Sequence, residues 1–215
     1  MKKKKVFGVV GLGRFGFNVA KTLAEGGAEV IACDMDEEKV RQISDLVSKA
    51  FVLDATNEKA LKESGIASAD TVIVSIGENV EASILVVVQL MELGVKEIIA
   101  KAVNPLHGRI LERLGVSRVI HPERDMAIRL AHSLLVGGFI EEIPIAEDYS
   151  VFEIHAPERF YNKSLKELDL RKRYGITVLA IKRGEGILVN PSGDEKVMPK
   201  DILVVLGRMD KVSEL

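Results

Sequence analysis

The chain has one cysteine, no long apolar run and almost no net charge, and each of these shortages excludes a class of protein. Among 215 residues, Cys33 is the only cysteine, which excludes an internal disulfide framework and a multi-cysteine zinc site. No apolar run approaches the roughly 18 residues of a membrane-spanning helix, although 47% of the residues are hydrophobic. The formal charge of −2 gives no reason to expect a nucleic-acid partner. A basic run at residues 2–5 lacks the apolar segment and cleavage site of a secretory signal, so we expect a soluble, cytoplasmic protein.

The GxGxxG segment at residues 11–16 has the spacing of a phosphate-binding turn. By itself the pattern is weak, because glycine-rich hexapeptides arise by chance. Here it follows the apolar run 6–10, leads into the helical spacing of residues 15–23, and precedes a second apolar run at 29–33 that ends at Asp34. A strand, a glycine turn, a helix and an acidic residue about 20 positions later are the parts of a dinucleotide-binding unit.

Each residue type in this unit has a physical role. Gly11 permits the tight turn, Gly13 allows a diphosphate to approach the backbone, and Gly16 lets the helix pack closely on the strand. The amino end of the helix presents free N–H groups to a phosphate. Asp34 accepts hydrogen bonds from ribose hydroxyls and disfavours the 2′-phosphate of an NADP-type ligand. The alternative is that the glycines serve only a tight strand-to-helix turn.

Strand and helix patterns then alternate as far as residue 120, which is typical of an α/β fold with a doubly wound parallel sheet of the Rossmann type. We expect a nucleotide-binding domain over residues 1–121. The expected strands are 6–10, 29–33, 50–53, 71–76, 97–102 and 118–120. The expected helices are 15–23, 37–46 after the cap Asp36, 58–64 after the cap Asn57, 80–93 and 107–114.

A further helix begins at Pro122, after the sheet is complete, and ends at residues 137–138. Its apolar surface must be buried on something else, so we expect a dimerisation arm within a crossover and linker segment, 122–148. The alternative is a sixth helix packed on its own sheet. From residue 149 the pattern favours a small α+β domain, 149–215, whose poorly alternating strands we expect a symmetry mate to cover. Its expected elements are strands 151–155, 177–181, 187–189 and 202–206 and one helix at 164–172.

Nine short segments carry a resemblance to a known family. They are GLGRFG at 11–16, VLDAT at 52–56, VSIGEN at 74–79, IAKA at 99–102, VIHPERDM at 119–126, DLR at 169–171, YG at 174–175, LAIK at 179–182 and DILVVLG at 201–207. Together they resemble regulator of potassium conductance (RCK) subunits of the Ktr/Trk type, which combine a TrkA-N with a TrkA-C domain. The resemblance covers nearly the whole chain and is more specific than any single motif.

The resemblance implies a regulatory subunit that catalyses no reaction. Proteins of this type form homodimers and octameric gating rings beneath a membrane-embedded subunit of the KtrB or TrkH type, which translocates potassium ions. ATP favours the conducting form of the assembly and ADP the closed form. The chain is then expected on the inner face of the cell membrane, held there through its partner.

The resemblance also implies a set of nucleotide-binding residues. Arg14 would reach the γ-phosphate of ATP across a subunit interface, and the alternative is a solvated arginine at a helix start. Glu123 would bind a divalent or monovalent cation beside the phosphates, and the alternative is a favourable interaction with the helix dipole alone. The full set is Gly11, Gly13, Arg14, Phe15, Gly16, Asp34, Met35, Asp54, Ala55, Thr56, Ser75, Ile76, Gly77, Asn79, Lys101 and Glu123.

The second domain is where the resemblance leaves the function open. In some relatives this domain dimerises and binds cyclic di-AMP in an apolar cleft. The matching positions here are Leu165, Leu170 and Pro191, and a plain apolar core explains them as easily.

Three other functions use the same nucleotide fold. An NAD(H)-sensing Trk-type regulator stays open, because Asp34 suits the ribose of ATP or NAD, whereas Arg14 favours a triphosphate. An NAD-dependent oxidoreductase needs an acid or base beside the nicotinamide, and no constellation of His, Lys and Tyr after residue 148 suggests one. A transcription regulator of the Rex type needs a winged-helix domain, and none precedes Val6.

Overall fold

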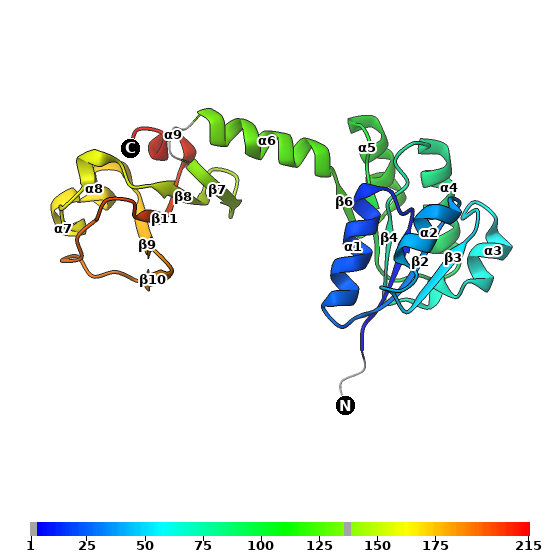
Figure 1. The fold of residues 1–215 in the computed structure, drawn as a ribbon. Coiled ribbons are helices and arrows are strands. Elements are labelled where there is room, and N and C mark those ends of the chain that lie inside the picture. The colour runs from blue at the N-terminus through cyan, green and yellow to red at the C-terminus, as the bar shows by residue number, and fades with distance from the viewer. Residues whose placement is uncertain (1–3, 136–138) are drawn as a thin grey trace. The chain divides into compact units, whose positions relative to one another are not determined.

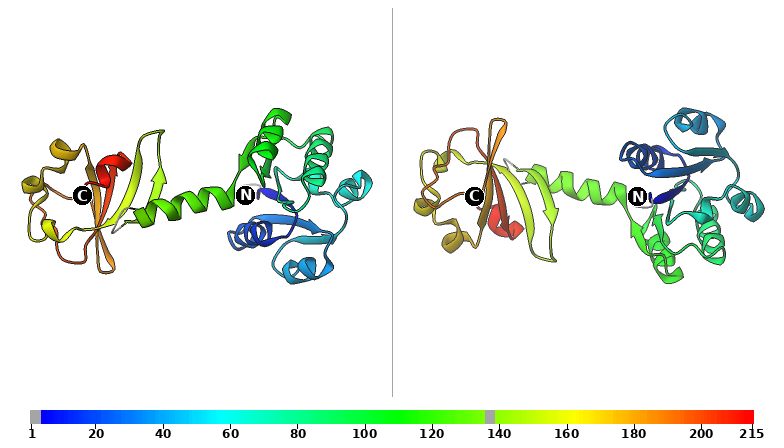
Figure 2. Two further views of the ribbon diagram at one scale, coloured as in Figure 1. Left: turned by 90° about the horizontal axis from the view of Figure 1, so that it is seen from above. Right: turned by 90° about the horizontal axis from the view of Figure 1, so that it is seen from below.

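The computed structural model describes residues 4–135 and 139–215, which form two compact units (Figure 1). The first unit ends at Pro122 and the second begins at Glu123. Two further views are given in Figure 2. No described helix combines the length and the apolar character that crossing a membrane requires.

The first unit is a six-stranded parallel sheet, which confirms the predicted Rossmann-type fold. The strand order is β3-β2-β1-β4-β5-β6, so the order reverses between β1 and β4. The strands are β1 (Val6–Val10), β2 (Glu29–Asp34), β3 (Lys49–Val52), β4 (Thr71–Val74), β5 (Ile98–Lys101) and β6 (Arg118–Ile120). The helices are α1 (Arg14–Glu25), α2 (Glu37–Ile43), α3 (Glu58–Glu63), α4 (Val80–Glu92) and α5 (Pro105–Leu114), with a 3-10 turn at Ile66–Ser68.

Both faces of this sheet are apolar, and helices cover both, as Figure 2 shows. Helices α1 and α2 pack on one face, where they contribute Ala20, Val40 and Ile43 to the apolar core. On the other face, α3, α4 and α5 contribute Leu61, Val86, Val87, Leu90 and Leu111. Burial on both faces explains why the strands read as continuous apolar runs. The carboxyl edge of the sheet is left for polar residues.

Short polar side chains begin four of the five helices of this unit. Asp36 accepts two backbone N–H groups in the first turn of α2. Asn57, Asn79 and Asn104 each accept one such group in α3, α4 and α5. These caps satisfy N–H groups that have no partner within the helix. Helix α1 differs, because its N-cap is Gly13 and no side chain bonds to its first turn.

The second unit combines a long helix with a five-stranded antiparallel sheet in the order β10-β9-β11-β8-β7. The strands are β7 (Phe139–Pro144), β8 (Ser150–His155), β9 (Thr177–Arg183), β10 (Gly186–Val189) and β11 (Ile202–Gly207). The helices are α6 (Pro122–Leu135), α7 (Leu165–Leu168), α8 (Leu170–Tyr174) and α9 (Met209–Val212), with a 3-10 turn at Glu158–Phe160. Its apolar core includes Phe152, Ile154, Leu168, Ile181, Leu203 and Val205.

Three predictions for this unit are wrong in detail. The single helix predicted at 164–172 is two short helices, because Asp169 adopts a left-handed φ of 45° between α7 and α8. Strand β7, which pairs with β8, lies where a linker is predicted. Strands β8 and β11 do alternate in burial, so their sequence pattern needs no symmetry mate as its cause.

Helix α6 carries apolar side chains that are exposed in the single chain. The exposed fractions are 62% for Met126, 58% for Leu130 and 77% for Leu134. The predicted end of this helix at 137–138 lies outside the described residues. The arm that packs on a partner subunit stays a prediction.

Candidate functional site

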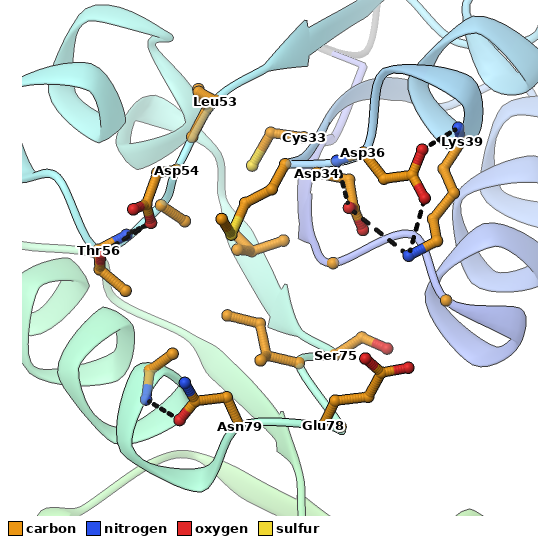
Figure 3. A pocket seen from close by; sticks show the side chains of 18 residues that line it. Cys33, Asp34, Asp36, Lys39, Leu53, Asp54, Thr56, Ser75, Glu78 and Asn79 are labelled. Atoms are coloured by element: carbon orange, nitrogen blue, oxygen red, sulfur yellow. Dashed lines mark hydrogen bonds and ion pairs between the residues drawn. The ribbon is translucent and has the colours of Figure 1, made fainter.

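A pocket of about 310 Å³ lies at the carboxyl edge of the parallel sheet (Figure 3). It is placed around β1, β2, β3 and β4, and includes the point where the strand order reverses. In open α/β sheets this reversal separates the loops and leaves a crevice for a ligand. The lining residues are Val10, Gly11, Gly13, Cys33, Asp34, Met35, Asp36, Lys39, Leu53, Asp54, Ala55, Thr56, Ser75, Ile76, Gly77, Glu78, Asn79 and Ala82.

The glycine turn that joins β1 to α1 is closely packed at two positions and open at a third. Gly11 has a φ of +92°, a conformation that residues with a Cβ rarely adopt. A Cβ on Gly16 would lie 2.0 Å from the carbonyl oxygen of Gly11, so only glycine fits where the helix approaches the turn. A Cβ on Gly13 would meet nothing within 4 Å. Gly13 therefore leaves space at the pocket, into which a phosphate can come close to the backbone.

The first turn of α1 presents uncapped backbone N–H groups beside this space. No side chain caps the helix, and its first turn contains no acidic residue. The unpaired N–H groups and the helix dipole together favour an anion there. Because the other four helices of this unit are capped by Asp or Asn, α1 is the helix whose N-terminus is available to a ligand.

Asp34 at the end of β2 connects the glycine turn to the loop before α2. Its Oδ2 accepts the N–H of Leu12 at 2.6 Å, and its Oδ1 accepts the N–H of Asp36 at 2.9 Å. The Nζ of Lys39 lies 3.8 Å from the same Oδ1. These contacts fix the carboxylate at the pocket, and each oxygen keeps acceptor capacity for a second donor such as a ribose hydroxyl.

The far wall of the pocket comes from the loops after β3 and β4. Asp54 Oδ1 accepts both the N–H and the hydroxyl of Thr56, at 2.9 and 2.7 Å. Gln89 of α4 donates to the Thr56 carbonyl oxygen at 2.8 Å, which ties this loop to the helix layer. The Ser75 hydroxyl is buried with no hydrogen-bond partner among the described residues. A bound ligand or water would satisfy it, since buried polar groups are normally paired.

Cys33 is the one thiol of the pocket lining, and it is not a nucleophile. Burial first, and then the charge of Asp34, raise the pKa of this thiol to about 12. The protonated thiol is unreactive at neutral pH, because the thiolate is the nucleophilic form. Cys33 therefore contributes an apolar surface to the pocket.

The pocket unites most of the predicted site residues but not all of them. Arg14, Phe15, Gly16, Lys101 and Glu123 are not among its lining residues. Arg14 is exposed at the start of α1. The Nζ of Lys101 lies 3.5 Å from the Cβ position of Gly77, so it is close to the pocket wall. Glu123 belongs to the second unit. The lining residues that we predicted are Gly11, Gly13, Asp34, Met35, Asp54, Ala55, Thr56, Ser75, Ile76, Gly77 and Asn79.

Several lining residues were absent from the prediction: Val10, Cys33, Asp36, Lys39, Leu53, Glu78 and Ala82. Two of them had a signal in the sequence. Lys39 lies three residues after the cap Asp36, and so one helical turn from it, and Glu78 stands between two predicted site residues. No group of three or more His, Cys, Asp or Glu side chains suited to a metal ion occurs within residues 4–135 and 139–215, apart from masked side chains. The cation site predicted at Glu123 stays a prediction.

A second, shallower hollow of about 270 Å³ lies in the second unit. It brings together the three positions Leu165, Leu170 and Pro191, with Lys166 and Arg171 at the same hollow. Leu170 is also part of the buried apolar core, and Leu165 packs against that core. Both the ligand-binding and the core interpretation of these leucines therefore have a structural basis.

The chain matches two models of protein families. The TrkA-N domain model matches residues 7–122, and the TrkA-C domain model matches residues 149–215. The two matches together cover most of the chain and meet the two units described above.

Several known proteins are similar over nearly their full length. Ktr system potassium uptake protein C of Bacillus subtilis is 43% identical, with 98% of this chain and 95% of that protein covered. Ktr system potassium uptake protein A of the same organism is 39% identical, with 95% and 92% covered. Ktr system potassium uptake protein A of Vibrio alginolyticus is 36% identical, with 97% and 95% covered.

Solved structures share the fold at low sequence identity. A structure described as the GsuK channel has a TM-score of 0.69 and 15% identity, with 99% of this chain and 39% of that chain covered. A structure of the GsuK channel bound to NAD has a TM-score of 0.64 and 15% identity, with 98% and 38% covered. At this identity the likeness concerns the fold.

Proposed function

The chain belongs to the family of Ktr-type potassium uptake subunits with a TrkA-N and a TrkA-C domain, and from this premise we propose that it regulates potassium uptake in response to an adenine nucleotide. In this proposal the first unit binds the nucleotide. The bound state then determines whether a membrane-embedded potassium-translocating partner conducts.

The observation that carries the proposal is the arrangement of the glycine turn, the uncapped N-terminus of α1 and Asp34 around one pocket. The helix N-terminus favours a phosphate, and the carboxylate favours ribose hydroxyls. Between them, Cys33, Leu53 and Ile76 offer an apolar wall for a base. The pocket volume of about 310 Å³ is at the small end of the range for ligand pockets, roughly 300–1,000 Å³.

We propose ATP and ADP as the two ligands between which the protein distinguishes. The pocket lining contains four acidic side chains, Asp34, Asp36, Asp54 and Glu78, and one basic side chain, Lys39. A triphosphate therefore needs cations from beyond this lining. Lys101 beside Gly77 is one source, and the exposed Arg14 is another, which suits a contact made to the nucleotide of a neighbouring subunit.

The assembly that we propose is a ring of subunits on the cytoplasmic side of the membrane, with a partner of the KtrB or TrkH type. The exposed apolar residues of α6, Met126, Ile128, Leu130 and Leu134, support self-association as its first step. An octamer is the number of subunits implied by the family resemblance. Glu123 is the proposed cation ligand beside the nucleotide.

We propose that the protein catalyses no reaction. The similar proteins are named as potassium uptake proteins, and none of the three names describes an enzyme. The thiol of the pocket is held protonated by burial. A nucleotide sensor needs only differential binding, so the residues of the pocket are sufficient without a catalytic group.

A second candidate is an NAD(H) sensor at the same pocket. It is favoured by Asp34, which suits the adenosine ribose of either ligand, and by the NAD-bound GsuK channel, a protein with the same fold. In the second unit, the hollow at Leu165, Leu170 and Pro191 is the proposed place for cyclic di-AMP, with Lys166 and Arg171 available to its phosphates.

The test is calorimetric titration of the purified protein with ATP, ADP, NAD+ and NADH, together with light scattering to measure its mass. Binding of ATP and ADP by an octamer supports the nucleotide-switched ring. Tight NADH binding by a dimer that ignores ATP and ADP contradicts the ATP/ADP proposal, and a turnover assay then separates a redox sensor from an enzyme. Cyclic di-AMP is titrated separately against the wild type and Pro191→Ala.

A further inference from the structure

A lysine stands at the corner of the pocket where the ribose is expected. Lys39 lies in the first turn of α2, and its Nζ is 3.8 Å from Asp34 Oδ1 and 3.6 Å from Asp36 Oδ2. Figure 3 shows the amine between these two carboxylates at one side of the pocket. Neither the glycine fingerprint nor the predicted site contains this residue.

The charges at this corner are fixed in different ways. Both oxygens of Asp34 already accept backbone N–H groups, so this carboxylate cannot turn away from a ligand. Asp36 is held as the N-cap of α2. Lys39 is the mobile member, because its side chain is 41% exposed and its contacts are ion pairs longer than a hydrogen bond. It can therefore exchange a carboxylate partner for a ligand group at little cost.

We infer that Lys39 is a specificity-determining residue that sets how strongly the pocket rejects a phosphate on the 2′ position of the adenosine ribose. This inference rests on the proposed nucleotide function of the pocket. With Lys39 the corner carries two negative charges and one positive charge, and without it the two carboxylates face the ribose unopposed. Asp34 alone predicts strict rejection of a 2′-phosphate, whereas Lys39 makes the rejection incomplete.

The chain contains a matched control for this lysine. Lys21 lies 3.8 Å from Glu25 on α1, and its side chain is 44% exposed, so its ion pair and exposure are close to those of Lys39. Lys21 does not line the pocket. Lys21→Ala and Lys39→Ala therefore remove similar helical ion pairs, and only the second removes a charge from the ribose corner.

The experiment uses two pairs of ligands that differ only by the 2′-phosphate. These are AMP with adenosine 2′,5′-bisphosphate, and NAD+ with NADP+. For each pair, the ratio of dissociation constants is measured by calorimetry at low and high salt in the wild type, Lys39→Ala, Lys39→Arg and Lys21→Ala. We expect Lys39→Ala to raise the preference for the unphosphorylated ligand about tenfold at low salt, and less at high salt because exposed charges are screened.

Lys39→Arg keeps the positive charge and is expected to retain the wild-type ratio within about twofold. Lys21→Ala is expected to leave the ratio unchanged. An equal ratio in Lys39→Ala and Lys21→Ala overturns the inference while the nucleotide function stands. A ratio change without salt dependence also overturns it, since the effect is then not one of charge. If the wild type binds none of the four ligands and no ATP or ADP, the proposed function fails and the inference with it.

Discussion

Each of the two units holds one aspartate in a network of donors, and the two networks are completed differently. Asp34 in the first unit accepts two backbone N–H groups, and its side chain is 13% exposed at a pocket. Asp201 in the second unit is fully buried. Its two oxygens accept Nε and Nη2 of Arg183, each at 2.9 Å, and the N–H of Met198 at 2.7 Å.

The difference separates a carboxylate that can bind a ligand from one that stabilises the fold. Arg183 also bonds to Glu195 and to the carbonyl oxygen of Lys196, so the Asp201 network ties the loop before β11 to β9. All strong donors near Asp201 belong to the protein. Asp34 is held by backbone groups alone and keeps acceptor capacity that faces the pocket.

The largest effect is expected when the internal network is broken. Arg183→Ala leaves the carboxylate of Asp201 buried without its cation, which should lower the free energy of unfolding by about 3 kcal/mol. The measurement is urea denaturation of the full chain, followed by a signal from the second unit. Nucleotide binding in the first unit should be retained.

Lys182→Ala is the matched control for this substitution. Lys182 pairs with Glu153 between β9 and β8, but at a half-exposed position. Its loss should cost less than about 1 kcal/mol, because such pairs are solvated in the unfolded and folded states. Equal losses from Arg183→Ala and Lys182→Ala would contradict the structural role given to the buried pair.

The second effect concerns the glycine turn, where stability and binding can be separated. Gly16→Ala places a Cβ 2.0 Å from the Gly11 carbonyl oxygen, so we expect a loss of about 2 kcal/mol in stability together with the loss of nucleotide binding. Gly13→Ala meets no atom within 4 Å and has an ordinary φ of −61°. It should leave stability within about 0.5 kcal/mol and still weaken nucleotide binding at least about tenfold, because the methyl group occupies the approach of the phosphate.

Thermal unfolding and calorimetric titration of the two variants measure both quantities. Wild-type affinity in Gly13→Ala would show that no phosphate approaches this backbone. The glycine turn would then be structural only, and the site would lose its comparison with Asp201.

The third effect concerns Arg14, which is exposed outside the pocket lining. If it bonds to a γ-phosphate, Arg14→Ala should reduce the preference for ATP over ADP about tenfold, since a hydrogen bond to a charged group contributes about 1.5 kcal/mol or more. ADP affinity should change little. Titrations with both nucleotides decide this, and an equal loss for both would refute the γ-phosphate role.

The smallest effect is a pH dependence that belongs to the second unit. Burial opposes ionisation of Asp201, but the bonds from Arg183 and the Met198 N–H together outweigh it and hold its pKa below the ordinary value of 3.8. A lowered pKa contributes stability that is present above pH 3.8 and is lost as the pH falls through the folded-state pKa. The stability difference between the wild type and Arg183→Ala should therefore shrink between pH 5 and pH 2. A difference that is constant over this range would contradict the assignment.

Much of the first unit could be predicted from local sequence. Apolar runs marked all six strands, and Asp36 and Asn57 marked helix starts that the structure confirms as side-chain caps. Caps and buried parallel strands depend on residues close in sequence, which is why their pattern is readable. Strand ends were predicted up to two residues too long, because hydrogen bonding across the sheet decides where a strand stops.

The second unit was predicted less well because its elements are short. A left-handed Asp169 divides one predicted helix into two, and β7 is a strand through its pairing with β8. Both features depend on contacts across the unit, which short segments cannot specify alone. The same reason explains why the contacts of Asp201 with Arg183, 18 residues apart, were not predicted.

By itself, the sequence determined the Rossmann-type order of elements, the glycine turn and the acidic residue at the end of β2, because each depends on residue types at fixed local spacing. Only the tertiary structure decided which polar side chains share a pocket. Parallel strands bring the ends of β1, β2, β3 and β4 to one edge, so Lys39 and Glu78 join the predicted residues while Arg14 stays outside. Such neighbours come from loops distant in sequence, and their distances exist only once the sheet has formed.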